Sequence, residues 1–247
     1  MNNTSEIKSG IMETVNAVKY YDNAFTFWFG NEKVLLGGLM SDYPEFEKFF
    51  SYATIYHTIL DLDSKIKYSL EKAVDLADNI EFSTWKPIEP PSSNEACSLY
   101  YAENAIFRVA VLWDLLAQLY NLKENIGKPI NKVHAAQLFH DAQQGKTANA
   151  FAKKVYSYMQ QSENAEVEPW EGNHIFVKTM RDKMMHRNSP NVTTMSSYGF
   201  ELRLPAIYIL YRLSEEYRQV SEFISELVTL ILMDYKELNC KPEDISW

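Results

Sequence analysis

A short segment at residues 181–186, with the sequence RDKMMH, places an arginine and a histidine close together in the chain. An imidazole exchanges protons near neutral pH, and a planar guanidinium binds phosphate through two parallel hydrogen bonds. Together they could cleave a phosphodiester without a metal. His186 would move a proton in such a reaction, and Arg181 would stabilise the charge that develops on the phosphate. Asp182 could orient either side chain, so these three are the candidate catalytic residues.

The residues around this segment are basic, although the chain as a whole is acidic. With 24 Lys and Arg against 33 Asp and Glu, the net charge is −9, which makes the chain a poor non-specific binder of nucleic acids. Five of the six arginines nevertheless fall between residues 181 and 218, so a site that binds phosphate bidentately is expected there. The candidate substrate-binding residues are Lys178, Lys183, Arg187 and Asn188.

A regular helix would not bring Arg181 and His186 together. Positions five apart diverge by about 140° around a helix axis. If Val177, Met180 and Met184 form the core stripe, Arg181 lies at its edge and the histidine points nearly opposite. Two arrangements remain open: the helix loosens before residue 188, or a second chain supplies its own copy of the segment across a two-fold axis.

The other histidines give weaker indications. His57 lies in the middle of an expected helix and is interpreted as structural. Glu171 and His174 have the Glu-x-x-His spacing of di-iron bundles, but such sites need a second copy and two more glutamates, so we interpret Glu171 as compensating a helix dipole. His140-Asp141 resembles the paired ligands of HD-type metal phosphohydrolases. An exposed helix end is the better interpretation, and the phosphohydrolase is kept as a third alternative.

The elements that would position these residues are helices. Only eight glycines and nine prolines interrupt the chain, and no alternating strand pattern is sustained. The apolar periodicity and the breakers predict helices at 11–29, 44–80, 94–125, 132–143, 147–161, 169–188 and 201–238, with 31–43 as a loop or hairpin-like turn and 191–199 as a polar loop. Long helices with short connections predict an all-α helical bundle. The proline-rich linker at 84–93 could divide the chain into N-terminal helices at 1–90 and a bundle at 91–247, and a single compact domain is equally allowed.

Arg181, the polar Asp182 and His186 match, residue by residue, the motif of the HEPN superfamily, which the chain resembles over about residues 91–247. The expected helix with Arg108 also looks like a helix of such bundles. The resemblance implies a four-helix HEPN-like core with additional N-terminal helices. It further implies metal-independent endoribonuclease activity and a homodimer in which the motif lines a shared cleft.

These observations give two hypotheses of different kinds. The first is a metal-independent endoribonuclease that also uses no other cofactor. It would be of the defence or toxin kind and would have an antitoxin partner. The alternative is a non-catalytic helical module that binds RNA, nucleotide or a protein partner through the same basic residues. Cys97 and Cys240 show no metal-ligand spacing and are expected to be reduced thiols. No secretory or membrane-spanning run is found, so a cytoplasmic protein without a membrane partner is expected.

Overall fold

The computed structural model describes residues 4–21, 24–25, 27–29, 32–34, 44–79, 85–145, 149–163, 170–186, 191–196 and 199–237. It is 76% helical, with seven α-helices within these residues, and this confirms the predicted all-α helical bundle. The helices are α1 Thr4–Ala17, α2 Pro44–Leu76, α3 Ser93–Lys123, α4 Ala135–Gln144, α5 Ala150–Met159, α6 Asn173–His186 and α7 Ala206–Glu237. A 3₁₀ turn spans Ile130–Lys132.

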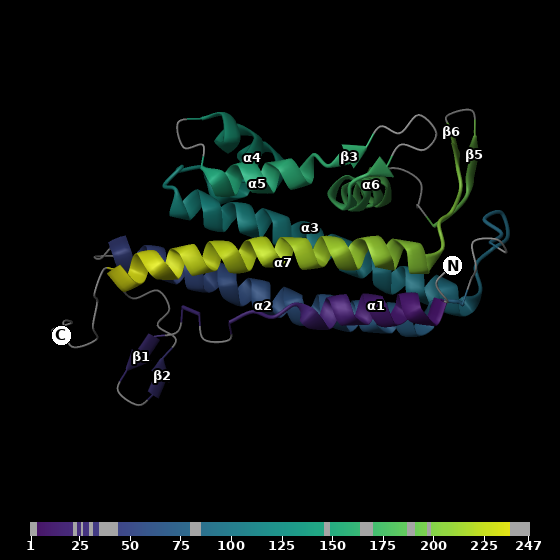
Figure 1. Ribbon diagram of the computed structural model, residues 1–247, viewed down its shortest axis with the longest axis horizontal. Coiled ribbons are helices and arrows are strands. Elements are labelled where there is room, and N and C mark those ends of the chain that lie inside the picture. Colours follow the sequence, from purple (N-terminus) through teal and green to yellow (C-terminus); the bar gives the residue numbers. More distant parts are fainter. Residues whose placement is uncertain are drawn as a thin grey trace.

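The three longest helices, α2, α3 and α7, run side by side along the long axis of the molecule (Figure 1). Helix α1 packs on α7 and α2 on one side. The short helices α4, α5 and α6 form a layer on the other side, against α3 and α7 (Figure 1). In the part of the chain that the structure describes, three two-stranded antiparallel hairpins join the helices: β1 Phe27–Phe29 with β2 Glu32–Val34, β3 Ser162–Glu163 with β4 Trp170–Glu171, and β5 Thr194–Ser196 with β6 Gly199–Glu201.

Helix α3 is the centre of the core. Its predicted apolar face is confirmed, because the following side chains are all buried: Leu99, Ala102, Ile106, Val109, Trp113, Leu116, Leu119 and Tyr120. By length and composition alone α3 could cross a membrane. However, 61% of its most apolar stretch is buried inside the bundle.

The predicted linker at 84–93 is non-helical where the structure describes it, and α3 begins directly after it. The Ser92 hydroxyl accepts the backbone N–H of Glu95 at 3.0 Å and so caps the helix. The guanidinium of Arg203 lies 4.1 Å from the ring centre of Trp85, which fixes the linker to the segment before α7. Helices from both sides of this linker contribute to the same hydrophobic cluster.

Three predicted helix boundaries are wrong near the ends of the chain. The first helix begins at Thr4 rather than at residue 11 and ends at Ala17 rather than near residue 29, and residues 27–34 include a β-hairpin. Side chains of α2 hold the chain after this helix, since Lys67 donates to the carbonyl of Val18 and Tyr56 to that of Tyr21. The last helix begins at Ala206 rather than at residue 201.

The late start of α7 has a local and a distant cause. Pro205 disfavours helical geometry in the residue before it. Residues 199–201 instead pair with 194–196, so the predicted polar loop at 191–199 contains a strand. The distant cause is Glu95, whose carboxylate accepts the backbone N–H of Ala206 at 2.7 Å. Helix α4 likewise starts at Ala135, where Asp114 accepts the backbone N–H at 3.2 Å.

Candidate functional site

Arg181 lines a cavity of about 230 Å³ that is enclosed by α3, the start of α4, α5, α6 and α7. The polar and charged residues around the cavity are Asp114, His134, His174, Lys178, Arg181 and Glu216. Lys178 and His134 are exposed to solvent, whereas Glu216 is fully buried. The cavity therefore opens to water near Lys178 and His134 and ends at the carboxyl group of Glu216.

Helix α6 presents Arg181 to this cavity because its other face is packed in the core. Val177 and Met180 are buried and Met184 is partly buried against them, so the predicted core stripe is confirmed. Arg181 lies at the edge of this stripe, with 30% of its side chain exposed. Gly172 fixes the start of the helix: its N–H donates to the carbonyl of Gln161 at 2.8 Å, and a Cβ there would come within 2.3 Å of that oxygen.

Asp182 binds and orients the guanidinium of Arg181. The Nε and Nη2 groups of Arg181 donate to Asp182 Oδ1 at 3.0 and 2.7 Å, and Lys178 Nζ donates to Oδ2 at 3.1 Å. Burial by itself would raise the pKa of Asp182, but the hydrogen bonds from Arg181 and Lys178 outweigh it and hold the pKa below its ordinary value. The carboxylate is therefore ionised at neutral pH, and within the described residues Nη1 of Arg181 makes no hydrogen bond.

Replacing Asp182 by asparagine is expected to lower the free energy of unfolding at pH 7 by no more than about 0.5–1 kcal/mol, because partly exposed ion pairs contribute little. The folded-state pKa lies below the ordinary value of 3.8. The contribution of the pair is therefore present above pH 3.8 and is lost as the pH falls through the folded pKa. Urea unfolding of both proteins should show a difference at pH 7 that disappears as the pH falls through the folded pKa of Asp182. A loss of more than about 2 kcal/mol would contradict the surface-pair assignment.

The other residues predicted around the motif lie in different places: one lines the cavity, one is ion-paired away from it, and the others lie outside what the structure describes. Lys178 lines the cavity with Arg181. Lys183 does not, because its ammonium lies 2.8 Å from a carboxylate oxygen of Glu201 on β6. His186 is the last residue of α6, and its side chain lies outside what the structure describes. Arg187 and Asn188 lie outside the described residues.

Most of the arginines between 181 and 218 serve the fold. Arg212 is buried, donates to Asn173 Oδ1 and to the carbonyl of Glu171, and stacks over Phe176. Arg203 is also buried, and it donates to the carbonyl of Glu89 at 3.1 Å. Arg218 is paired with two carboxylates of its own helix, those of Glu215 and Glu222. Among the described arginines, Arg181 is therefore the one that lines the cavity.

The residue that the sequence interpretation missed is His174. It lies seven positions before Arg181 on α6, and seven residues turn a helix by about 700°, so the two side chains leave it within about 20° of the same direction. His174 Nδ1 lies 2.9 Å from Glu216 Oε1, and 11% of the imidazole remains exposed. The spacing His-x6-Arg within one helix would have indicated this shared face.

Glu216 is held by two further donors. Trp113 Nε1 donates to Oε1 at 2.6 Å, and the Tyr158 hydroxyl donates to Oε2 at 2.6 Å. The ring of Trp113 also packs edge to face on the imidazole of His174, with centroids 4.7 Å apart. Burial, with the neighbouring Glu216 charge, raises the pKa of Tyr158 far above its ordinary value, so this hydroxyl stays protonated and remains a donor. The cavity floor is thus a fixed carboxylate–imidazole pair.

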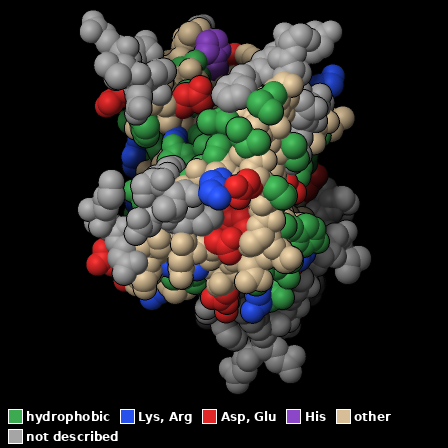
Figure 2. Space-filling view, turned by 90° about the vertical axis from the view of Figure 1, so that its right-hand side faces the viewer, with side chains coloured by type: hydrophobic (Ala, Val, Ile, Leu, Met, Phe, Trp, Pro, Cys, Tyr) green, Lys and Arg blue, Asp and Glu red, His purple; other side chains and the backbone are tan. Residues whose placement is uncertain are grey.

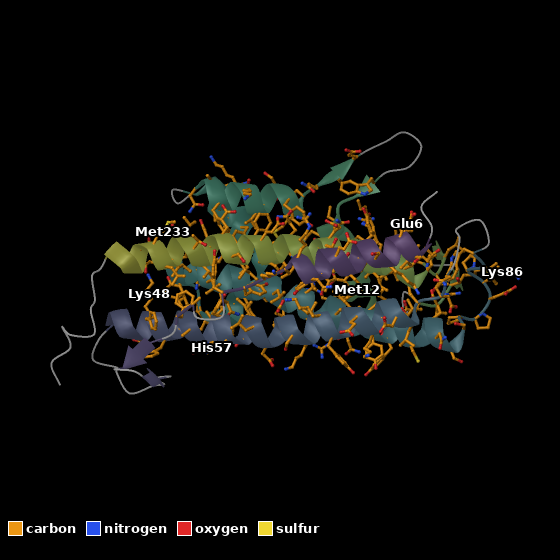
Figure 3. The ribbon with its side chains drawn as sticks, turned by 60° about the horizontal axis from the view of Figure 1, so that its bottom comes forward. Glu6, Met12, Lys48, His57, Lys86 and Met233 are labelled. Atoms are coloured by element: carbon orange, nitrogen blue, oxygen red, sulfur yellow. The ribbon has the colours of Figure 1, made fainter. Side chains whose placement is uncertain are left out.

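His57 and His140 lie away from the cavity. His57 is on α2, across the long helices from the layer of α4, α5 and α6 (Figure 3). The imidazole of His140 lies 3.4 Å from Asp141 near the exposed end of α4, which ends at Gln144 just before Gly145, as the sequence indicated. Within the described residues, no group of three or more His, Cys, Asp or Glu side chains could hold a metal ion.

Apolar side chains are exposed on two parts of the surface. Figure 2 shows them gathered on the end of the molecule that carries β5 and β6, where Met195 and Leu202 are exposed. On α3, Tyr100, Phe107 and Val111 form an exposed stripe. This stripe runs beside the cavity, since Ala110 and Asp114 of the same helix line it.

No family model matches the chain, and comparisons with curated proteins and with solved structures find no match either. The function therefore has to be inferred from the cavity and from the residues that surround it.

Proposed function

We propose that the protein is a metal-independent endoribonuclease of the HEPN kind, with Arg181 as the group that binds the scissile phosphate. The observation that carries this proposal is the position of Arg181 on the wall of a solvent-connected cavity, with Lys178 one turn away and with no hydrogen bond from Nη1 to any residue that the structure describes. A cation fixed where the charge of a phosphorane develops stabilises the transition state without having to reorganise. Asp182 supplies that fixation through two hydrogen bonds to one edge of the guanidinium.

The proposed reaction is an internal transesterification. The 2′-hydroxyl oxygen attacks the adjacent phosphorus as its proton is removed, and the P–O5′ bond breaks as the 5′-oxygen takes up a proton. The products are a 2′,3′-cyclic phosphate and a 5′-hydroxyl, with no change of oxidation state. The protein must therefore supply proton transfer and charge stabilisation, which histidine and arginine side chains provide.

The proposal includes a homodimer with the motif at a shared cleft. The backbone of α6 is helical from Arg181 through His186, so the two residues start from directions about 140° apart. Met185, beside His186, is 58% exposed, and the α3 stripe of Tyr100, Phe107 and Val111 flanks the cavity. A second copy that covers these apolar surfaces would bring its own His186 towards the cavity of the first.

Cleavage of end-labelled RNA in EDTA tests the activity. The wild-type chain is expected to give products with cyclic phosphate ends, and Arg181→Ala is expected to lower kcat by about 10²–10³-fold, as for removal of one oxyanion-stabilising group. His186→Ala is expected to fall by a similar factor. Arg218→Ala is the matched control, because it removes an ion-paired arginine that does not line the cavity. Absence of cleavage, or equal rates in all four proteins, would reject the proposal.

A mixing experiment tests the shared cleft. Arg181→Ala and His186→Ala protomers, each inactive alone, should regain part of the activity when they are refolded together, because one cleft of the mixed dimer then carries both wild-type residues. Light scattering should give twice the mass of the 28.7 kDa chain. A monomer at micromolar concentration, or no recovery on mixing, would contradict the shared cleft.

One observation favours the second candidate, a non-catalytic module that binds RNA, nucleotide or a protein partner. Asp182 already occupies Nε and Nη2 of Arg181, the two groups that would bind a phosphate side-on. RNA binding without cleavage, weakened in Arg181→Ala and Arg187→Ala and unchanged in His186→Ala, would support this candidate. A cytoplasmic defence or toxin role, with an antitoxin that restrains the nuclease, is supported by the HEPN resemblance and belongs to the first proposal.

A further inference from the structure

We propose that His174 is the general base of the reaction, and that Glu216 is the positioning residue that orients it. The inference rests on the proposed function, because it assigns a proton-transfer role inside the same cavity. It starts from a difference between the two histidines of α6. His174 shares a helix face and a cavity with Arg181, whereas His186 starts about 140° away on the same helix.

The hydrogen bond to Glu216 decides which nitrogen of His174 can act. A carboxylate oxygen only accepts, so the Nδ1 atom that lies 2.9 Å from Glu216 Oε1 carries the proton. In the neutral ring, Nε2 then bears a lone pair, and no described residue hydrogen-bonds to it. The same carboxylate–imidazole arrangement fixes the tautomer of the histidine base in serine proteases.

The surroundings hold the imidazole in place without blocking it. The edge-to-face contact with Trp113 fixes one side of the ring. Trp113 and Tyr158 both donate to Glu216, so its carboxylate cannot turn away from His174. The ring still lines the cavity and keeps part of its surface accessible. A nucleotide that enters past Lys178 would therefore meet a fixed acceptor at the inner end.

His174, Lys178 and Arg181 lie at positions i, i+4 and i+7 of one helix, so they form a row along one face. Lys178 and Arg181 would hold the non-bridging phosphate oxygens, and Nε2 of His174 would accept the proton of the adjacent 2′-hydroxyl. The freed oxygen closes on phosphorus and the 5′-oxygen leaves with a proton from the second histidine, His186, or from water. His174 then releases the proton that it took from the 2′-hydroxyl to solvent, so each proton in the reaction is accounted for.

The test is His174→Ala with chemical rescue. The variant is expected to lower kcat by about 10²–10⁴-fold, the usual contribution of a general base. Free imidazole should restore part of the rate, because the deletion opens a space of its own shape beside Glu216. His140→Ala is the matched control: His140 also contacts a carboxylate, that of Asp141, but it does not line the cavity. It should keep the wild-type rate and show no response to imidazole.

A substrate with a good leaving group distinguishes the general base from the general acid. Uridine 3′-(4-nitrophenyl phosphate) needs no proton on its leaving oxygen, so His186→Ala should cleave it at nearly the wild-type rate while His174→Ala stays slow. Glu216→Gln should lower kcat and leave KM nearly unchanged, because Gln can keep the contact with His174 but not its negative charge.

Two results overturn the inference in different ways. RNA cleavage by the wild-type chain that survives in His174→Ala rejects this role and leaves the proposed function standing, whereas no cleavage by the wild-type chain rejects both. If the His174→Ala variant does not fold, ¹⁵N NMR of the wild-type protein still tests the inference. Nδ1 of His174 should be the protonated nitrogen, and a 2′-deoxy dinucleotide should shift the Nε2 resonance in the wild type but not in Arg181→Ala. The opposite tautomer, or no shift, overturns the inference.

Discussion

Glu216→Ala is expected to lower the free energy of unfolding by about 3–5 kcal/mol, the cost of breaking a buried, hydrogen-bonded charged group. The Glu216 side chain is fully buried and accepts from Trp113, Tyr158 and His174. Alanine would leave these donors without their acceptor and would enlarge the cavity. In a chain of this length each 1 kcal/mol shifts Tm by roughly 2–4 °C, so a fall of about 6–20 °C is expected by calorimetry.

The isosteric variant Glu216→Gln separates hydrogen bonding from packing. Its amide oxygen can still accept from Trp113 and His174, and its NH₂ group would face Tyr158, whose hydroxyl can rotate and accept instead. We therefore expect a loss of only about 1 kcal/mol. A Glu216→Ala variant as stable as the wild type would show that water replaces the carboxylate, and would remove the argument for a fixed His174.

Much of the fold follows from local pattern. The apolar periodicity of α3 and the breakers around Gly127 and Pro129 place that helix to within two residues at each end. The start of α4 could not be predicted this way and that of α7 only in part, because Asp114 and Glu95 contribute to them from 21 and 111 residues away. A carboxylate that caps a distant helix leaves no mark in the sequence around that helix.

The site shows the same limit. The core stripe of α6 and the edge position of Arg181 were predictable, because both depend on spacing within one helix. Glu216 was not, since it meets His174 only when α7 packs against α6. The number of arginines also does not show that Arg203 and Arg212 donate hydrogen bonds to backbone carbonyls, one in the linker and one in a hairpin. A motif search compares neighbours in sequence, whereas this cavity joins five helices.

Glu95→Gln is expected to be more harmful than Glu216→Gln, although the two substitutions are chemically identical. Glu95 is buried in the first turn of α3, and its two oxygens accept backbone N–H groups of Ala206, at the start of α7, and of Asp78, just after α2. Backbone amides can only donate, so whichever way the glutamine turns, its NH₂ group faces one of them.

The Glu95 variant also removes a negative charge from the N-terminal ends of two helices, where the helix dipole favours it. We expect Glu95→Gln to lose about 2–3 kcal/mol in urea unfolding, since a charged hydrogen bond is lost and a buried N–H is left unpaired. Glu216→Gln, unfolded under the same conditions, should lose at least about 1 kcal/mol less. Equal losses would contradict the reasoning, because the two sites differ mainly in whether one partner of the carboxylate can change from donor to acceptor. The Tyr158 hydroxyl can make that change, and the N–H of Ala206 cannot.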